Sequence, residues 1–300
     1  MADRLQSCYR EVNVTDWRLV GEEVLGTKPK RWRADPQTGE QWLLKDATYS
    51  RPADGTSYRK GDDWAERIAT GVAERLELPA AQTELAVDTR GDETCLGVIS
   101  RDMRTPEEDL LHGNELLKDP PVGRGRSGYT LEAVREALQG VRPPTGIPEA
   151  FTAWDVFVGY LVLDAVIGNT DRHEENWAVL RRGELLKLAP SFDHASSLGF
   201  LWSDSAREAR LATRDRGYTV EAWAEKARSW FAGRPDVLDV AVAALEMSSS
   251  HTRSRWLDRC QDADRLVEPI WYVPSHRMSR TAGEFAERLV RHNRRRLVVG

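Results

Sequence analysis

The sequence predicts an α+β fold with two unlike parts, a small β-rich part followed by a larger helical part. Residues 1–103 contain short strand-like runs around a single helical pattern. Helical patterns dominate residues 104–300, and the run at 149–167 is apolar on nearly every face. A chain of 300 residues is long enough for one large domain or two lobes with a substantial core.

The first predicted unit is hairpin-like. Residues 16–25 (DWRLVGEEVL) and 40–45 (EQWLLK) have the composition of strands. The segment GTKPKRW at 26–32 is predicted to be a phosphate-sized loop between them. The Asp, Pro and Gly residues within 34–39 (ADPQTG) indicate a turn.

One helix is predicted in this part, over residues 62–78 (DDWAERIATGVAERLEL). Its apolar positions recur at steps of four: Trp64, Ile68, Val72 and Leu76. Asp62 is a plausible N-cap and Pro79 ends the helix. Two more strands are expected at 83–88 and 94–100, around the turn TRGDE.

The second part begins with short helices predicted at 106–118 and 130–140. The apolar helix at 149–167 is predicted to be the buried spine of a helical lobe. Two short strands should follow at 176–182 and 184–190, joined by a glycine, and the remainder is mostly helical by pattern.

Composition narrows the class of protein. Hydrophobic residues make up 40% and charged residues 30%, which is ordinary for a globular protein, and the net charge of -5 argues against a general nucleic-acid binder. The three cysteines have neither metal-ligand spacing nor a disulfide pattern, which indicates a reducing cytoplasm. The first residues lack the apolar core of a secretory signal, and the longest apolar run contains two aspartates, so no membrane span is expected.

A polar cluster, GNTDRHEENW at 168–177, directly follows the apolar helix. Asp171 and Asn176 have the spacing of a phosphoryl-transfer catalytic loop, in which the Asp orients or accepts the proton of the attacking hydroxyl and the Asn holds Mg²⁺. By themselves these residues also fit a solvated loop. The following hairpin leads to Asp193, a carboxylate placed to bind the same metal and bridge it to nucleotide phosphates.

A kinase also needs a cation on the phosphates, and Lys45, at the end of an apolar strand, is the candidate. Glu66, in the middle of the predicted helix, is its candidate partner. Alone, each fits an ordinary surface residue, but their order ahead of the catalytic loop favours a kinase. The loop between the first strands offers backbone amides and ammonium groups that could cradle phosphates. The candidates there are Gly26, Thr27, Lys28 and Lys30.

The pair of motifs IGNTDRHEENW (167–177) and LKLAPSFDHASSLG (186–199) resembles the HipA-like protein kinases. The family pattern is a D-x-H-x-x-N loop followed by an LAP-x-[FY]-D strand. The similarity reaches back through WAERIATGVAERLELPA (64–80), Lys45 and the GTKPKRW stretch, and covers roughly residues 16–200.

The resemblance implies a two-lobed, protein-kinase-like fold with ATP and Mg²⁺ in the cleft. It implies that Asp171 is the catalytic base and that Asn176 and Asp193 are metal ligands. His173 would order the catalytic loop through hydrogen bonds, since the aspartate already fills the role of base.

The resemblance also implies a nucleotide-binding role for Lys45, on the α- and β-phosphates, with Glu66 as its possible ion-pair partner. Residues 97–103 (GVISRDM) would be the hinge that presents backbone groups to adenine. The hinge candidates are Ser100, Arg101 and Met103.

The chain departs from the family in three places. HipA toxins carry an extra N-terminal domain, for which little room exists before residue 16. Some relatives are silenced by phosphorylation of a serine in the phosphate loop, where Thr27 is the only hydroxyl here. His194, rather than Phe-Gly, follows Asp193, which removes a simple in/out switch. Antitoxin pairing and a translation-factor target are therefore not carried over.

The favoured activity is γ-phosphoryl transfer from ATP to a Ser/Thr hydroxyl of a protein of unknown identity, with a possible regulatory protein partner. Because DRHEEN also resembles the loop of phosphatidylinositol kinases, a lipid kinase is an alternative, as is a small-molecule kinase. A nucleotide-binding pseudokinase is a further alternative. The presence of Lys45, Asp171, Asn176 and Asp193 together argues against it.

Overall fold

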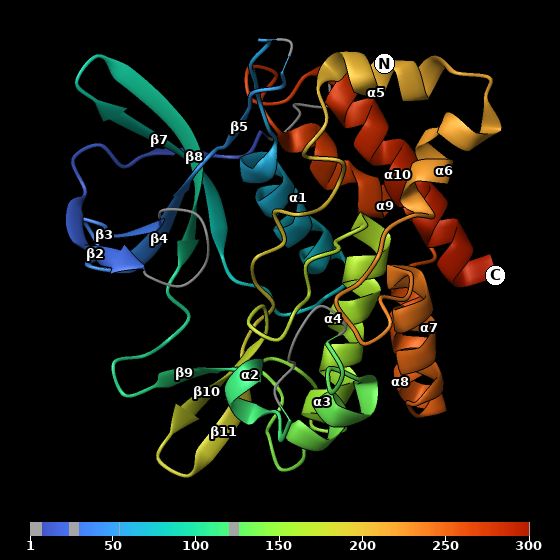
Figure 1. Ribbon diagram of the computed structural model, residues 1–300. Coiled ribbons are helices and arrows are strands. Elements are labelled where there is room, and N and C mark those ends of the chain that lie inside the picture. Colours follow the sequence, from blue (N-terminus) through green and yellow to red (C-terminus); the bar gives the residue numbers. More distant parts are fainter. Residues whose placement is uncertain (1–7, 24–29, 54, 120–125, 300) are drawn as a thin grey trace, which may run out of the picture.

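A six-stranded sheet and one long helix form a small lobe (Figure 1, left and centre). The computed structural model describes residues 8–23, 30–53, 55–119 and 126–299. The sheet has the order β1-β7-β8-β4-β3-β2, and only the β1–β7 pair is parallel. Its strands are β1 (Glu11–Asn13), β2 (Arg18–Glu23), β3 (Lys30–Ala34), β4 (Gln41–Asp46), β7 (Thr83–Arg90) and β8 (Glu93–Arg101). A small ribbon pairs β5 (Tyr49–Ser50) with β6 (Tyr58–Arg59).

Strand β3 corrects the expected extent of the first loop. Residues 30–32, predicted to belong to that loop, lie in β3 and pair with β4, where Lys30 is opposite Lys45. Strand β4 is central in the sheet and pairs with β8 on one side and with β3 on the other. This pairing outweighs the loop-like composition of residues 30–32. Lys30 and Lys45 therefore sit on neighbouring strands.

Helix α1 (Asp62–Arg75) packs against β7 and β8 and is buried along almost its whole length. The four apolar positions predicted for its core are buried as expected. Asp62 is the first residue of the helix and not its N-cap, which is Gly61. Its carboxylate accepts hydrogen bonds from the Thr48 backbone and hydroxyl, at 3.1 and 2.8 Å, and so ties the helix start to the end of β4.

The larger lobe is helical and is built around α4 (Ala153–Ile167), which is buried on every side except at Asp155. A capping box between Thr152 and Asp155 begins α4, and Gly168 ends it in the left-handed conformation with φ 65°. Helices α7 and α10 pack along it (Figure 1). The other helices of this lobe are α3 (Leu131–Ala137), α5 (Asp204–Ala212), α6 (Val220–Ala224), α7 (Val237–Glu246), α8 (Ser250–Arg259), α9 (Ala263–Val267) and α10 (Arg280–Val299), with 3₁₀ turns η1 (Arg216–Tyr218) and η2 (Glu268–Tyr272).

A second sheet, with the order β11-β10-β9, lies below the six-stranded sheet at the lower left of Figure 1. Strands β10 (Ala178–Arg182) and β11 (Leu185–Leu188) confirm the predicted hairpin. The helix predicted at 106–118 is wrong in its first half: β9 (Asp109–His112) is a strand, and only α2 (Gly113–Leu116) is helical. β9 covers the free edge of β10, and this long-range pairing outweighs the local helical pattern.

The three cysteines are unpaired. Within the described ranges, no helix combines the length and apolar character needed to cross a membrane. The division of the chain at residues 103 and 104 stays a prediction.

Candidate functional site

The predicted catalytic loop leaves the end of the buried helix α4. The Asn169 amide donates to Asp164 Oδ1 at 2.7 Å, and the Asn169 backbone N–H donates to the Asp164 carbonyl at 2.9 Å. Asp164 lies on the last turn of α4, and only 3% of it is exposed. Because the loop is bonded to a residue that is itself fixed in the core, its backbone is held rigidly at the helix end.

Arg172 holds the interior of this loop, a role that the sequence did not predict. Its guanidinium is buried and bonds both carboxylate oxygens of Asp164, at 2.8 and 2.9 Å, and the Asn176 carbonyl at 2.6 Å. It also donates to the Ser191 hydroxyl at 2.9 Å. Burial by itself would lower the pKa of Arg172, but the Asp164 carboxylate outweighs burial and raises it. Arg172 is therefore a permanent cation that joins both ends of the loop.

The candidate base, Asp171, is oriented by two side chains. Trp230 Nε1 donates to Asp171 Oδ1 at 2.8 Å, and the Ser196 hydroxyl donates to Oδ2 at 3.2 Å. A carboxylate oxygen has two lone pairs, so each oxygen can still accept a further hydrogen bond. Trp230 lies 59 residues away in the chain, and no sequence signal distinguishes it from the other tryptophans.

His173 makes the loop-ordering contacts expected of it. Its ring Nδ1 accepts a hydrogen bond from the Glu175 backbone N–H at 3.2 Å, and the backbone N–H of His173 donates to the Asp171 carbonyl at 2.8 Å. The ring also meets Trp230 edge-on, with centroids 6.2 Å apart. His173 thus supports the conformation of the loop and the position of Trp230 together.

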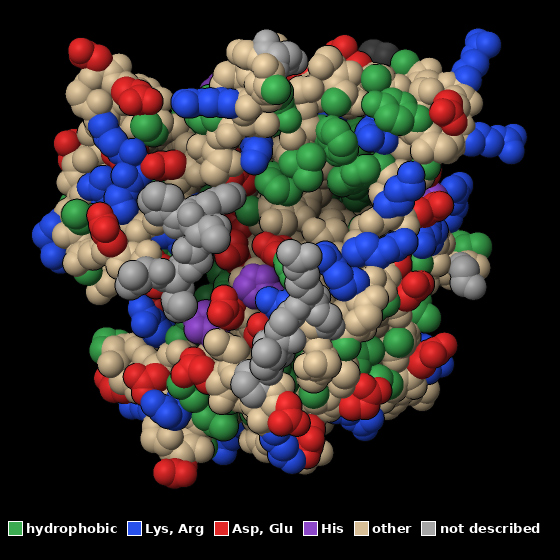
Figure 2. Space-filling model, viewed as in Figure 1, with side chains coloured by type: hydrophobic (Ala, Val, Ile, Leu, Met, Phe, Trp, Pro, Cys, Tyr) green, Lys and Arg blue, Asp and Glu red, His purple; other side chains and the backbone are tan. Residues whose placement is uncertain are grey.

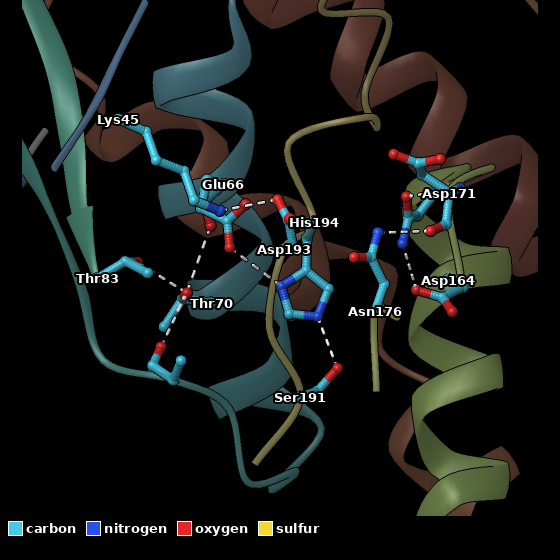
Figure 3. Close-up of polar contacts among 12 residues, drawn as sticks. Lys45, Glu66, Thr70, Thr83, Asp164, Asp171, Asn176, Ser191, Asp193 and His194 are labelled. Atoms are coloured by element: carbon cyan, nitrogen blue, oxygen red, sulfur yellow. Dashed lines mark hydrogen bonds and ion pairs between the residues drawn. The ribbon is translucent and has the colours of Figure 1, made fainter. Parts of the chain in front are cut away.

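Asn176 lies between the base and Asp193 (Figure 3). Its amide nitrogen donates to the Asp171 carbonyl at 2.7 Å, which turns the amide oxygen towards Asp193. Asp193 follows β11 in a backbone conformation with φ 59°, which is costly for a residue other than glycine. The two predicted metal ligands thus face one another across the site.

Two ammonium groups meet Asp193. Lys45 Nζ lies 2.8 Å from Asp193 Oδ1, and Lys30 Nζ lies 3.8 Å from Oδ2. Burial alone would raise the pKa of the Asp193 carboxyl, but Lys45 and then Lys30 outweigh burial and hold that pKa well below its usual range. Burial alone would lower the pKa of Lys45, and the carboxylates of Asp193 and Glu66 reverse that shift and raise it.

The expected direct ion pair between Lys45 and Glu66 is not the contact found. Lys45 bonds Asp193, whereas the nearest partner of Glu66 is His194, with Glu66 Oε1 3.5 Å from His194 Nδ1 (Figure 3). Glu66 nevertheless acts on the lysine through its charge, and Lys45 in turn lowers the pKa of Glu66 against the opposing effect of burial. The carboxylates of Glu66 and Asp193 compete for the Lys45 ammonium group, and Asp193 is the closer of the two.

The remaining nucleotide-binding candidates lie in three places. Gly26, Thr27 and Lys28 lie outside the described residues. Ser100 and Arg101 belong to β8, where Ser100 is opposite Leu43, and the Arg101 side chain pairs with Glu40. Met103 packs with the buried residues of β10 at the junction of the lobes. The backbone N–H of Arg101 already donates to the Gln82 carbonyl at 2.9 Å, so this group is not free to bond adenine. The role of residues 97–103 as an adenine-binding hinge stays a prediction.

The donor set suits Mg²⁺ with a nucleotide and not a metal held by protein alone. Asp193 and Asn176 supply hard oxygen ligands, which Mg²⁺ prefers, together with phosphate and water oxygens. Among the described residues, no group of three or more His, Cys, Asp or Glu side chains could hold a metal ion. Figure 2 shows acidic and histidine side chains at the hollow between the two lobes.

Both the sequence and the fold of this chain are similar to known proteins. A family model described as HipA-like C-terminal domain matches residues 21–264. No curated protein sequence matches the chain. Among solved structures, the Helicobacter pylori proinflammatory kinase CtkA superposes with a TM-score of 0.69 at 18% identity, covering 97% of this chain and 96% of that chain.

A second similar structure is HipA of Shewanella oneidensis MR-1, solved with HipB and operator DNA. It superposes with a TM-score of 0.50 at 13% identity, covering 95% of this chain and 68% of that chain. The likeness to CtkA confirms the expected α+β fold, with its β-rich lobe and its helical lobe. From its match over residues 21–264, this chain belongs to the HipA-like C-terminal domain family.

Proposed function

We propose that this protein is a kinase that transfers the γ-phosphoryl group of ATP to a serine or threonine hydroxyl of a protein. The observation that carries the proposal is the meeting of Lys45, Asp171, Asn176 and Asp193 in one site, although they come from both lobes and from distant parts of the chain. Each residue type matches a part that phosphoryl transfer requires: a phosphate-binding cation, a base and two metal ligands.

In the proposed reaction, the acceptor oxygen attacks the γ-phosphorus, the bond to the β,γ-bridging oxygen breaks, and ADP leaves. Asp171 orients the acceptor hydroxyl and accepts its proton, while Trp230 and Ser196 keep the carboxylate in place. Asn176 and Asp193 would hold Mg²⁺, which neutralises the charge of the phosphates when bound. Lys45 and Lys30 add positive charge on the same side of the site.

The acceptor class follows from the family resemblance, and no contact in the site selects a lipid or a small molecule over a protein. A regulatory protein partner also stays a prediction. HipA of Shewanella oneidensis was solved together with HipB, and that partnership is a property of HipA.

Intact-mass measurement after incubation with Mg-ATP tests the proposal, with the Asp171→Asn variant as a control. The isosteric amide keeps an oxygen for the Trp230 donor, so the variant should fold normally. We expect phosphate to be gained by the wild-type protein, or by an added protein acceptor, and not with Asp171→Asn. ADP formation without a phosphorylated protein would favour a small-molecule or lipid kinase. Equal phosphorylation by the variant would refute the role of Asp171.

A further inference from the structure

A continuous chain of polar contacts crosses from the small lobe to the helical lobe beneath the site. It runs from Glu66 on α1 to His194, Ser191, Arg172 and Asp164 on α4. These residues are respectively 1%, 1%, 2%, 3% and 3% exposed. The part formed by Glu66, His194 and Ser191 is visible in Figure 3. We call this chain of five residues the buried relay. The links from His194 to Asp164 are hydrogen bonds, and the link from Glu66 to His194 is a longer polar contact. Buried polar groups in contact in this way favour one arrangement of the elements that carry them.

Donor and acceptor roles along the buried relay follow from its chemistry. Arginine can only donate, so the Ser191 oxygen accepts from Arg172 at 2.9 Å. The Ser191 hydroxyl can then give its proton to His194 Nε2, 2.7 Å away. This assignment leaves the His194 proton on Nδ1, facing Glu66 Oε1 at 3.5 Å. His194 Nε2 is therefore hydrogen-bonded to Ser191, whereas Nδ1 faces Glu66 across a contact that is too long for a normal hydrogen bond.

The backbone around the relay is joined to the same elements. The Ser191 N–H donates to the Pro79 carbonyl at 2.9 Å, and the Ala81 N–H donates to the Ser191 carbonyl at 2.8 Å. These bonds attach the segment that precedes Asp193 to the connection after α1. Asp193 itself has φ 59°, a conformation that persists in a non-glycine residue only where the surroundings enforce it. The adjacent His194 side chain, hydrogen-bonded to Ser191 and 3.5 Å from Glu66, is placed to supply that enforcement.

We infer that His194 is a positioning residue, which fixes the backbone of Asp193 and couples helix α1 to the catalytic loop. Through Ser191 and Arg172, a displacement of α1 would be transmitted to the Asn176 carbonyl, which Arg172 bonds at 2.6 Å. The two candidate metal ligands therefore depend on the same support. The consequence for Mg²⁺ rests on the proposed function, whereas the mechanical coupling rests on the contacts alone.

Three variants test the inference. Ser191→Ala removes the central hydroxyl of the buried relay with the smallest change in volume, and His194→Leu removes both ring contacts. Thr252→Val is the matched control: the Thr252 hydroxyl is buried and bonds an aspartate of α4 as well, at 2.7 Å from Asp155, but at the opposite end of that helix. All three changes remove a hydrogen bond made by a buried side chain, and only the first two break the relay.

Amide hydrogen exchange measures the coupling without any ligand. In Ser191→Ala we expect the amides of α1 and of residues 168–177 to exchange faster together, by about 10-fold, as for a lost buried hydrogen bond. In Thr252→Val both segments should keep the wild-type rates. Faster exchange of the loop with unchanged exchange of α1 would overturn the coupling. If His194→Leu does not fold, Ser191→Ala still decides the outcome.

A Mg²⁺ titration of nucleotide binding, followed with a fluorescent ATP analogue, measures the effect on the metal ligands. We expect Ser191→Ala to need about 10-fold more Mg²⁺ for half-maximal binding, as is usual when a residue that orients a metal ligand is lost. Metal-free nucleotide binding should stay unchanged. An unchanged Mg²⁺ requirement would overturn the positioning role. Wild-type protein that shows no Mg²⁺-dependent binding would instead contradict the proposed function, and the exchange rates would still decide the coupling.

Discussion

Lys45 Nζ lies 2.8 Å from Asp193 Oδ1, although the two residues are 148 positions apart in the chain. The lysine belongs to β4 of the small lobe and the aspartate to the loop after β11, so this ion pair joins the lobes at the centre of the candidate site. The side chains are 16% and 26% exposed, which leaves them partly screened by water but mostly enclosed. A change at either residue therefore alters both the charge of the site and the contact between the lobes.

Replacing Lys45 with methionine should remove one of the two ammonium groups proposed to bind the phosphates, while keeping the length of the side chain. Asp193 would lose its nearest cation, and the phosphates would lose a fixed positive charge. We expect the rate of phosphoryl transfer to fall about 100-fold, as for the loss of one preorganised electrostatic contact. The matched control is Lys187→Met on β11, because Lys187 pairs with Glu108 at 3.4 Å, away from the site. Equal losses in the two variants would show that the effect is not specific to the site.

The ion pair also predicts how stability depends on pH. The folded-state pKa of Asp193 is lowered, so its stabilising contribution is present above the unfolded pKa of about 4 and is lost as the pH falls further. The pKa of Lys45 is raised, so its contribution is present below about 10.5 and is lost as the pH rises through the folded-state pKa. The difference in Tm between wild type and Asp193→Asn should stay constant from about pH 5 to 9 and shrink in acid. A difference that grows in acid would contradict the pairing.

Trp230→Phe should slow the reaction without weakening nucleotide binding. The change removes the donor to Asp171 Oδ1 and keeps an aromatic ring, on which Arg126 and Arg234 lie at 4.5 and 4.6 Å from the ring centroid. A lost hydrogen bond to a charged group corresponds to a decrease of about 10-fold or more in kcat. We expect the affinity for ATP, measured by calorimetry, to be unchanged.

Trp202→Phe is the control for that experiment. The Trp202 indole N–H is buried and has no hydrogen-bond partner among the described residues, so its loss removes ring area but no contact to a carboxylate. Its kcat should match that of the wild type. A similar decrease in kcat for both variants would mean that Trp230 acts through packing and not through Asp171.

Arg277 should be among the most important residues for stability. It lies between η2 and α10, and its guanidinium enters the small lobe, where it bonds Glu11 at 2.6 Å and Asp63 at 3.1 Å. It also donates to the Ala86 and Gly97 carbonyls, at 2.7 and 3.3 Å. Arg277→Met would leave the buried Asp63 carboxylate with one cation fewer. We expect a loss of about 3–5 kcal/mol in the free energy of unfolding, measured by urea denaturation.

The control for Arg277 is Arg280→Met, three residues later. Its side chain is 88% exposed and pairs with Glu284 one helical turn away, so we expect the midpoint of the urea transition to be unchanged. An Arg277→Met midpoint equal to that of Arg280→Met would show that the buried contacts of Arg277 do not hold the small lobe.

The sequence predicted those parts of the site that depend on local spacing. Asp171, Asn176 and Asp193 lie within a short loop and hairpin, so their separation in the chain limits their separation in space. The buried helix α4 was predictable for a similar reason, because an apolar surface on all sides is a property of the segment itself. Lys45 could be selected because a lysine at the end of an apolar strand needs a partner.

The contacts that the sequence did not predict are made by residues distant in the chain. Trp230 reaches Asp171 from 59 residues away, and nothing near Trp230 in the sequence indicates that role. Nothing in the sequence distinguishes Arg172 from an ordinary loop residue, because its hydrogen-bond partners, Asp164 and Ser191, come from different elements. The sequence order pointed to Glu66 as the partner of Lys45, whereas the fold brings Asp193 into direct contact with Lys45, and Glu66 acts on the lysine through its charge. In each case the sequence spacing fits several contact partners equally well, and the tertiary packing decides which contact forms.

Calorimetric titration of ATP, with and without Mg²⁺, tests most directly whether this site binds a metal–nucleotide complex. We expect the wild-type protein to bind ATP more tightly with Mg²⁺, and Asp193→Asn to lose that gain because the carboxylate proposed to hold the metal is gone. The result that contradicts the proposed site is a Mg²⁺-dependent gain of the same size in both proteins, or no gain in the wild type.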